Sequence, residues 1–165
     1  MPNQSNKSRE SSSENILQIV TFLLADEKYG VDIMVADGIE TINRITPIPN
    51  SLDFVEGVLN LRGDVLPIIN LKKRFNLIGG NENPELYLTL TLEENMKIGI
   101  LIDSLDKVES IPTEQIQPPP PVISGIGREY ISGVANDSND NLVIILDINK
   151  LLSYEELELL KETQK

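Results

Sequence analysis

The chain has 165 residues, 40% of them hydrophobic, and a formal net charge of −12. It contains no cysteine and no histidine, which excludes a disulfide framework, a Cys/His zinc site and a Ser-His-Asp triad. The negative charge and the aromatic content of only 4% argue against nucleic-acid binding, because phosphates repel acidic proteins and base stacking needs aromatic side chains.

The chain begins with a polar, serine-rich stretch, residues 1–14, which predicts a disordered tail. This tail lacks the apolar stretch of a secretory signal, and no run of about 20 apolar residues predicts a membrane-spanning helix. We therefore expect a cytoplasmic protein. Residues 16–39 predict two strands around a turn at 25–28. Both alternating faces of the first strand are largely apolar, which predicts a strand covered on both sides.

Proline residues interrupt the strand pattern that follows. Pro47 and Pro49 cannot donate a ladder hydrogen bond, so they predict an edge strand or a linker. Pro67 lies in an apolar segment, residues 65–71, and predicts an edge strand whose second face is covered. The cover is either the other half of the chain or another protein.

The remaining elements are short. A helical turn is predicted at residues 71–77, and we interpret its cations, Lys72, Lys73 and Arg74, as a solvated helix face. The other predicted elements are a hairpin around 93–95, a strand at 107–112, a proline-rich connection at 115–129, a hairpin at 130–148 and a C-terminal helix at 153–165. Ser153 and Glu156 fit a capping box at the start of this helix.

Many short strands with brief helices predict an all-β fold of barrels or sandwiches. The order of hairpin, apolar strand and short helix occurs at residues 55–75 and again at 130–152. Two related small barrels would explain this repetition, and so would chance resemblance between strand patterns.

Acidic residues are the most abundant candidates for chemistry. The segment 137–141 resembles the start of a calcium loop, but Leu142 and Ile148 occupy the positions of the required glycine and glutamate. A polar hairpin turn is therefore the favoured interpretation. Catalysis or ligand binding by a carboxylate pair stays an alternative, although no particular pair stands out.

Arg62 stands at the end of an alternating strand, residues 55–62, on its less apolar face and next to Gly63. One interpretation is an arginine at a hairpin tip that pairs with Asp64 or Glu40, which would add only about 0–1 kcal/mol. The other is an arginine held at a rigid tip to bind a partner's carboxylate or carbonyl, for which its planar fork is suited.

At these residues the chain resembles the CheW family, the coupling proteins of bacterial chemotaxis. It reads EGVLNLRG from Glu56 and LPIINL from Leu66, and a family member typically reads G-V-x-N-L-R-G-x-x-x-P-[IV]-[IV]-[DN]-L. Supporting segments are 29–33, 45–49, 99–103 and 142–148, so the resemblance extends over about residues 16–152.

The resemblance implies an all-β fold with short helices, in which two five-stranded SH3-like barrels pack together, plus the C-terminal helix at 153–165. Within a CheW-like domain at 15–152, we expect barrels at roughly 28–80 and 81–147, with the first strand, 16–25, pairing between them. The implied function is a non-catalytic adaptor without a cofactor. It would link the cytoplasmic tip of transmembrane chemoreceptors to the regulatory domain of the histidine kinase CheA, without inserting into the membrane.

Candidate site residues follow from the resemblance by position. The implied receptor-binding residues are Arg62, Gly57, Gly63, Gly99 and Val108. The implied kinase-binding residues are Ile33, Ala36, Gly38 and Val65. Glycines at such positions allow close backbone approach or tight turns, so bulky replacements would damage the fold.

One segment departs from the family pattern. Many members carry V-x-E-I where this chain has Ala36-Asp37-Gly38-Ile39, so Gly38 occupies the usual glutamate position. Asp37 and Glu40 are the nearest substitutes, but neighbouring strand positions point to opposite faces. The departure is consistent with a divergent chemosensory system, such as one that controls surface motility, or with coupling to a different receptor class.

Overall fold

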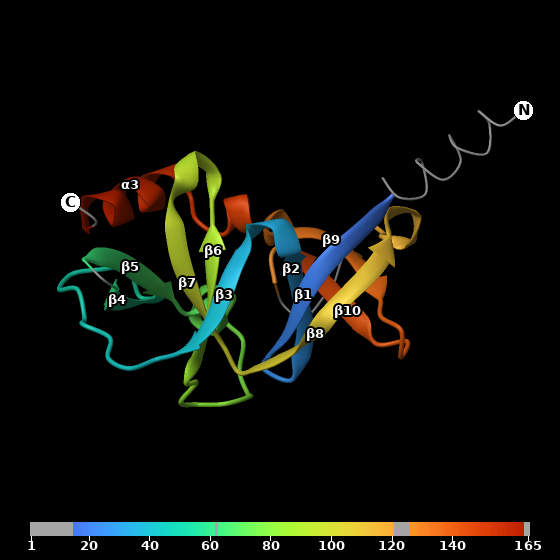
Figure 1. Ribbon diagram of the computed structural model, residues 1–165, viewed down its shortest axis with the longest axis horizontal. Helices are drawn as coiled ribbons and strands as arrows, with labels where there is room; N and C mark the ends of the chain where they lie inside the picture. Colours follow the sequence, from blue (N-terminus) through green and yellow to red (C-terminus); the bar gives the residue numbers. More distant parts are fainter. Residues whose placement is uncertain (1–14, 62, 121–125, 164–165) are drawn as a thin grey trace, which may run out of the picture.

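The computed structural model describes residues 15–61, 63–120 and 126–163, which form two five-stranded sheets and a C-terminal helix (Figure 1). The predicted 1–14 tail lies outside the described residues. Sheet A has the order β8 (Ser104–Pro112), β1 (Ile16–Leu24), β2 (Glu27–Asp32), β10 (Leu142–Leu146), β9 (Ile131–Asn136). Sheet B has the order β3 (Ala36–Thr41), β6 (Leu86–Thr91), β7 (Lys97–Ile102), β5 (Asp64–Ile69), β4 (Val55–Leu61). The predicted fold class is confirmed.

Short helical segments join the strands. The α-helices are α2 (Leu71–Arg74) and α3 (Tyr154–Thr163). The 3-10 turns are η1 (Ile33–Val35), η2 (Glu93–Asn95), η3 (Thr113–Gln115), η4 (Arg128–Tyr130) and η5 (Ile148–Lys150). All the hairpins predicted from turn residues are present, and the proline-containing segment before β4 is a linker with one bridge, from Thr46 to Val58.

The two sheets share one connectivity. Each contains one parallel pair, β10 with β2 in sheet A and β5 with β7 in sheet B, and its other neighbouring strands are antiparallel. The strands of sheet A can be matched one by one with those of sheet B: β8 with β3, β9 with β4, β10 with β5, β1 with β6 and β2 with β7. With this matching, the two sheets have the same strand order. The repetition seen at 55–75 and 130–152 corresponds to equivalent hairpins of the two sheets, which favours two related units over chance.

The strands group differently from the predicted barrel ranges, 28–80 and 81–147. Sheet B is built from the continuous stretch 36–102, whereas sheet A takes strands from both ends of the chain. The cause is β2, which pairs with β1 in a hairpin and with β10 in parallel. The first strand, β1, lies between β2 and β8 of its own sheet and does not pair between the two units.

The hydrophobic core has three parts. A large shared cluster takes residues from both sheets, for example Phe22 of β1 and Ile100 of β7. Smaller clusters belong to sheet A alone, around Ile19, and to sheet B alone, around Tyr87. Because Phe22 and Ile19 lie on opposite faces of β1, the prediction that both faces of this strand are covered is confirmed.

The prediction that Pro67 marks an edge strand is wrong. Its strand, β5, lies between β4 and β7, and the edges of sheet B are β3 and β4. Proline is tolerated here because the parallel ladder to β7 pairs only Ile68 and Ile69, after Pro67. The cover of its second face comes from the chain itself, since Ile69 belongs to the shared core.

The interpretation of the α2 cations as a solvated face is also wrong. Lys72 contacts Asp103 at 2.7 Å and Lys73 contacts Glu56 at 2.8 Å. Arg74 makes a bidentate pair with Glu156 of α3, at 3.0 and 2.8 Å, and stacks over the ring of Phe54. The cations of α2 therefore form ion pairs that connect this helix with β4, with α3 and with the residue between β7 and β8.

Helix α3 begins with the predicted capping box. Ser153 N donates to Glu156 Oε1 at 2.7 Å, and Glu156 N donates to Ser153 Oγ at 3.2 Å. Leu160 is buried and Leu157 packs against the shared core, but Tyr154 of the predicted apolar stripe is largely exposed. The apolar face of α3 is therefore narrower than the three-residue spacing predicted.

Candidate protein-binding surface

Three of the predicted site glycines lie in one row across sheet B. Gly57 is opposite Ile68, Ile68 is paired with Gly99, Gly99 is opposite Thr89, and Thr89 is opposite Gly38. The structure thus brings together residues from β3, β4 and β7 that are far apart in the sequence. The row joins positions assigned to receptor binding with one assigned to kinase binding.

Two of these glycines are required by close packing. Gly57 has φ +145°, and a Cβ there would lie 2.3 Å from the carbonyl oxygen of Thr46. A Cβ on Gly99 would lie 2.7 Å from Ile68 Cδ1 and 3.1 Å from Tyr87 Cδ2. Both positions are buried in the sheet, so a side chain at either one would disturb the packing of the strands.

Gly38 has a different environment. No atom lies within 4 Å of a Cβ built on it, and the residue is exposed on the edge strand β3. A β-bulge interrupts the register between Ala36 and Gly38. The regular alternation of faces, on which the expectation for Asp37 and Gly38 was based, is therefore interrupted at this point of β3.

The tip of the β4–β5 hairpin adjoins two open hollows. Arg62 lies outside the described residues, and Gly63 next to it has φ +89° in the turn. One hollow, here called the hairpin groove, has a volume of ≈ 420 Å³. Its lining residues are Leu61, Gly63, Asp64, Val65, Leu66, Thr89, Asn95 and Lys97. The other is also lined by Leu61 and includes Arg44 and Tyr87, whose hydroxyl donates to Glu40 Oε2 at 2.8 Å.

The other predicted residues are spread over the molecule. Val108 belongs to β8, the edge strand of sheet A, and is 53% exposed. Ile33 lies in η1 and packs against the shared core, and Ala36 begins β3 with its side chain half-buried. Val65 is half-buried and lines the hairpin groove, whereas Val108 is separated from the sheet B residues by the junction of the two sheets.

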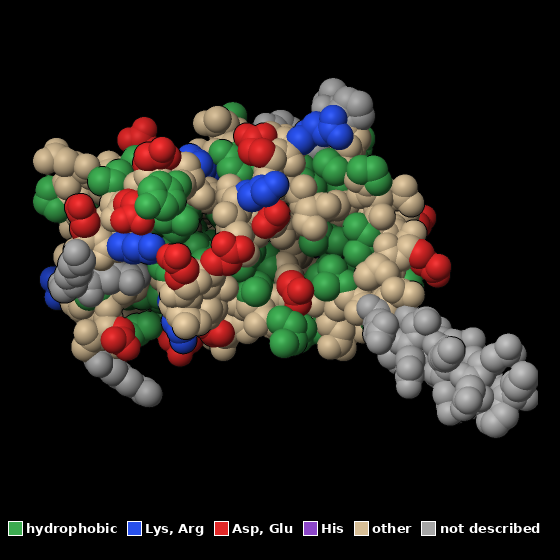
Figure 2. All heavy atoms as spheres, turned by 90° about the horizontal axis from the view of Figure 1, so that it is seen from above, with side chains coloured by type: hydrophobic (Ala, Val, Ile, Leu, Met, Phe, Trp, Pro, Cys, Tyr) green, Lys and Arg blue, Asp and Glu red, His purple; other side chains and the backbone are tan. Residues whose placement is uncertain are grey.

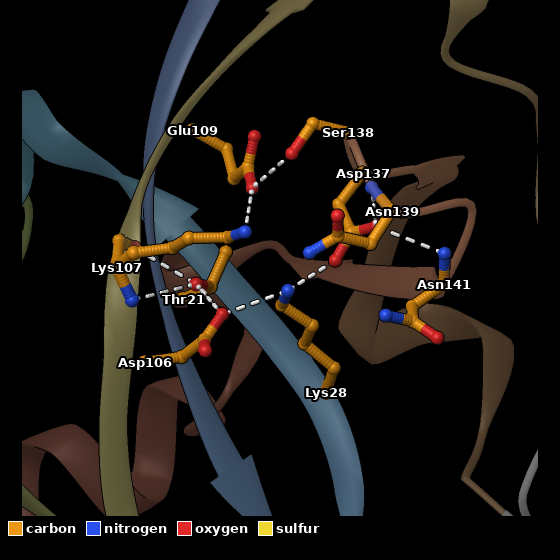
Figure 3. A network of polar contacts seen from close by, with 9 residues as sticks. All are labelled: Thr21, Lys28, Asp106, Lys107, Glu109, Asp137, Ser138, Asn139 and Asn141. Atoms are coloured by element: carbon orange, nitrogen blue, oxygen red, sulfur yellow. Dashed lines mark hydrogen bonds and ion pairs between the residues drawn. The ribbon is translucent and has the colours of Figure 1, made fainter.

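A polar network in sheet A was not foreseen from the sequence. The ammonium group of Lys28, on β2, lies 2.7 Å from Asp106 Oδ2 of β8 and also contacts Asp137 after β9 (Figure 3). Asp137 Oδ1 accepts hydrogen bonds from the backbone of Asn139 and Asn141. The 137–141 segment is thus the predicted polar hairpin turn, fastened through Asp137 to two other strands.

The network shifts the titration of its members. Burial lowers the pKa of Lys28, but hydrogen bonds to Asp106 and Asp137 outweigh it and leave this pKa raised. The hydrogen bond from Lys28 holds the pKa of Asp137 well below its usual range, against the effect of burial and with help from the backbone of Asn141 and Asn139. Three strands are therefore held by groups that stay ionised near neutral pH.

The surface carries mixed charges and exposed apolar side chains. On the face seen in Figure 2, Asp and Glu side chains are spread over the molecule, with Lys, Arg and hydrophobic side chains among them. Exposed large hydrophobic residues include Met34, Leu105, Val108 and Leu142. Among the described residues, no group of His, Cys, Asp or Glu side chains is arranged to hold a metal ion. No helix in the described part of the chain is long and apolar enough to cross a membrane.

Two sheets of equivalent topology with a shared core, open hollows and exposed apolar residues define a β-sheet protein-binding module. The CheW-like domain family matches residues 18–156, and the chain belongs to this family of chemotaxis adaptors. The chain is 44% identical, over 86% of its length and 85% of the relative, to the chemotaxis protein CheW of Treponema pallidum. It is 33% identical to that of Klebsiella aerogenes, over 90% of this chain and 89% of the relative.

A solved structure agrees with this assignment. The crystal structure of the scaffolding protein TtCheW from Thermoanaerobacter tengcongensis matches with a TM-score of 0.76 and 33% sequence identity. The match covers 85% of this chain and 90% of that protein. The CheW resemblance found at residues 56–71 therefore holds over most of the chain.

Proposed function

We propose that this protein links chemoreceptors to the histidine kinase CheA by binding alone, with no catalytic step and no cofactor. The observation that supports this most is the row formed by Gly57, Gly99 and Gly38 beside the hairpin groove. Positions assigned to the two partners lie within one sheet there, so both contacts would depend on the same backbone. We place the protein in the cytoplasm, recruited to membrane-associated receptor arrays.

The receptor contact would lie across the junction of the two sheets. Gly57 and Gly99 belong to sheet B and Val108 to sheet A, and the single residue Asp103 joins β7 to β8. Asp103 is held in place, since Lys72 Nζ and Ala25 N contact its carboxylate at 2.7 and 2.8 Å. A receptor segment that contacts Val108 and the Arg62 hairpin together would meet a junction fixed by these bonds.

The kinase contact would lie along β3 and the hairpin groove, at Ile33, Ala36, Gly38 and Val65. The bulge next to Gly38, and the glycine itself, make this strand differ from the family pattern. This difference favours a CheA homologue whose matching surface does not need the usual glutamate, as in a divergent chemosensory system.

The carboxylate alternative, an enzyme or a ligand-binding protein, receives less support. The buried carboxylates Asp137 and Asp103 each contact a lysine ammonium group, Lys28 and Lys72 respectively. Such pairs are ordinary structural ion pairs, and breaking one leaves an uncompensated buried charge.

The first test is a calorimetric titration of the protein with the CheW-like regulatory domain of a CheA kinase from the same genome. We expect binding in the micromolar range or tighter. No binding to any such kinase domain would remove the proposed function, while the fold and the family would stand.

The receptor side is tested by Arg62→Ala. We expect weaker receptor-dependent kinase control with a nearly unchanged thermal midpoint, because exposed ion pairs of an arginine contribute only about 0–1 kcal/mol. Arg128→Ala, at an exposed arginine of η4, is the matched control and should leave coupling intact. A large fall of the midpoint in Arg62→Ala would make this residue structural instead.

A further inference from the structure

Each of the two sheets contacts a hairpin turn of the other through a short helical segment. The segments α2 and η5 follow the matched strands β5 and β10, and the turns at Ala25 and Glu93 belong to the matched hairpins β1–β2 and β6–β7. In one direction, Asn149 of η5 accepts a hydrogen bond at Oδ1 from Glu93 N, at 3.0 Å. In the other direction, Lys72 of α2 is connected to the turn at Ala25 through Asp103.

The contact through Asp103 is the more extensive of the two. Lys72 Nζ lies 2.7 Å from Asp103 Oδ1 and 2.6 Å from the carbonyl oxygen of Asn81. Asp103 Oδ2 accepts a hydrogen bond from Ala25 N at 2.8 Å, and Asp103 N donates to Leu23 O at 3.0 Å. These five residues, here called the junction hub, connect the β1–β2 hairpin of sheet A with the α2–β6 loop of sheet B.

The junction hub is closely packed and largely shielded from water. The side chains of Lys72 and Asp103 are only 13% and 8% exposed. Gly80 has φ +75°, and a Cβ built on it would collide with Asp103 Oδ2 and lie 2.9 Å from Ala25 N. A side chain is therefore excluded at the point where the loop of sheet B meets the turn of sheet A.

The shared core and the junction hub have different physical effects on the two sheets. Burial of apolar side chains in the shared core stabilises their association, but this effect has no preferred direction. A buried ion pair adds little net stability, because the cost of removing two charges from water offsets their attraction. Its hydrogen bonds depend strongly on distance and angle, however. The junction hub is therefore suited to select one orientation of the sheets rather than to hold them together.

We propose that Lys72 and Asp103 are positioning residues, which fix the angle between the two sheets while the shared core supplies the stability. The contact of Asn149 has a minor part, because its hydrogen bond to Glu93 is neutral and exposed to solvent. Without the junction hub, the sheets should adopt more than one relative orientation around the same core, since apolar cores lose uniqueness before they lose stability.

One consequence of this assignment rests on the proposed function. The proposed receptor contact spans both sheets, at Val108 and the Arg62 hairpin, whereas the proposed kinase residues Gly38 and Val65 belong to sheet B alone. Loss of the junction hub should therefore weaken receptor-dependent kinase control more than it weakens binding of the kinase domain.

The orientation of the sheets can be measured without any partner, because the chain contains no cysteine of its own. Ser132→Cys on β9 and Asn60→Cys on β4 place one spin label at an exposed position of each sheet. Pulsed electron paramagnetic resonance on the full chain then gives the distribution of distances between the labels. With Lys72 and Asp103 intact, we expect a single narrow maximum.

The test variant combines Lys72→Met with Asp103→Asn in the labelled chain. It removes both charges together, so that no unpaired charge is left buried, and the new amide oxygen can still accept the hydrogen bond from Ala25 N. We expect a thermal midpoint close to that of the wild type, because replacing a buried ion pair is often neutral. The distance distribution should nevertheless become broader or show a second maximum.

Two controls are matched to this variant. Lys73→Met removes a cation from the same helix, but Lys73 pairs with Glu56 of the same sheet, at 2.8 Å. Asn149→Ala removes the contact in the opposite direction. Both controls should keep the narrow distribution.

Each outcome decides whether Lys72 and Asp103 position the sheets. An unchanged distribution in the double variant would overturn the assignment, because the core alone would then fix the orientation. A double variant that does not fold would overturn it as well, because the pair would then be required for stability. Equal broadening in Lys73→Met would show that the effect is not specific to the junction hub. None of these results depends on a partner, so the adaptor role is tested separately by the kinase titration.

Discussion

The glycines in the row across sheet B differ in how much space there is for a side chain. We expect Gly57→Ala to destabilise the protein by more than about 1 kcal/mol, because its positive φ and the Thr46 carbonyl leave no room for a Cβ. Gly38→Ala should stay within about 0.5 kcal/mol of the wild type, since the space around it is open. Urea unfolding of both variants checks this, and equal losses would contradict the packing argument.

Two buried tyrosines make a second matched pair of residues. Tyr29 is fully buried, and its hydroxyl has no hydrogen-bond partner among the described residues. Tyr87 is also buried but donates to Glu40, and burial with this bond raises its pKa to about 12. Tyr29→Phe should therefore be neutral or stabilising, whereas Tyr87→Phe should cost about 1 kcal/mol. A destabilised Tyr29→Phe variant would indicate a partner, such as a buried water, for its hydroxyl.

At the scale of elements, the ion pairs of Lys28 connect β2 with β8 and with the turn after β9. Because the folded pKa of Asp137 lies below its unfolded value of about 4, its contribution to stability is complete above that pH and decreases as the pH falls further. Lys28 has a raised pKa, so its contribution to stability is present at neutral pH. It is lost only in the alkaline range, as the pH rises through that pKa.

Asp137→Asn tests this network. It should lower the free energy of unfolding at neutral pH by about 1–3 kcal/mol, because Lys28 then loses one of its two carboxylate partners and keeps Asp106. The variant should also lose less free energy of unfolding than the wild type as the pH falls below about 4. Denaturant unfolding across this range is the measurement, with Asp140→Asn as the control in the exposed part of the same turn. An unchanged acid slope in Asp137→Asn would assign that slope to other carboxylates.

At the scale of the whole molecule, the features predicted correctly are those that residues close together in the sequence determine. Alternating strands and Gly or Asn turns predicted the hairpins, and the motif at Arg62 led to the family. The grouping of strands was missed because β2 and β10 pair in parallel although more than a hundred residues separate them. The Lys28–Asp137 contact spans 109 residues for the same reason. No local sequence pattern predicts such pairings, so the Lys28 network is visible only in the folded chain.

The shared core predicts that the two sheets fold as one unit. Residues 36–102 contain every strand of sheet B, but their own cluster around Tyr87 is small, and most of their buried side chains face the shared core. We therefore expect a 36–102 fragment to be unfolded or aggregated in isolation, since it would expose that apolar face to water. The full chain should instead unfold in one transition with coincident far-UV circular dichroism and calorimetric midpoints. A fragment with a cooperative transition of its own would show that sheet B folds independently. The shared core would then add stability without being required for folding.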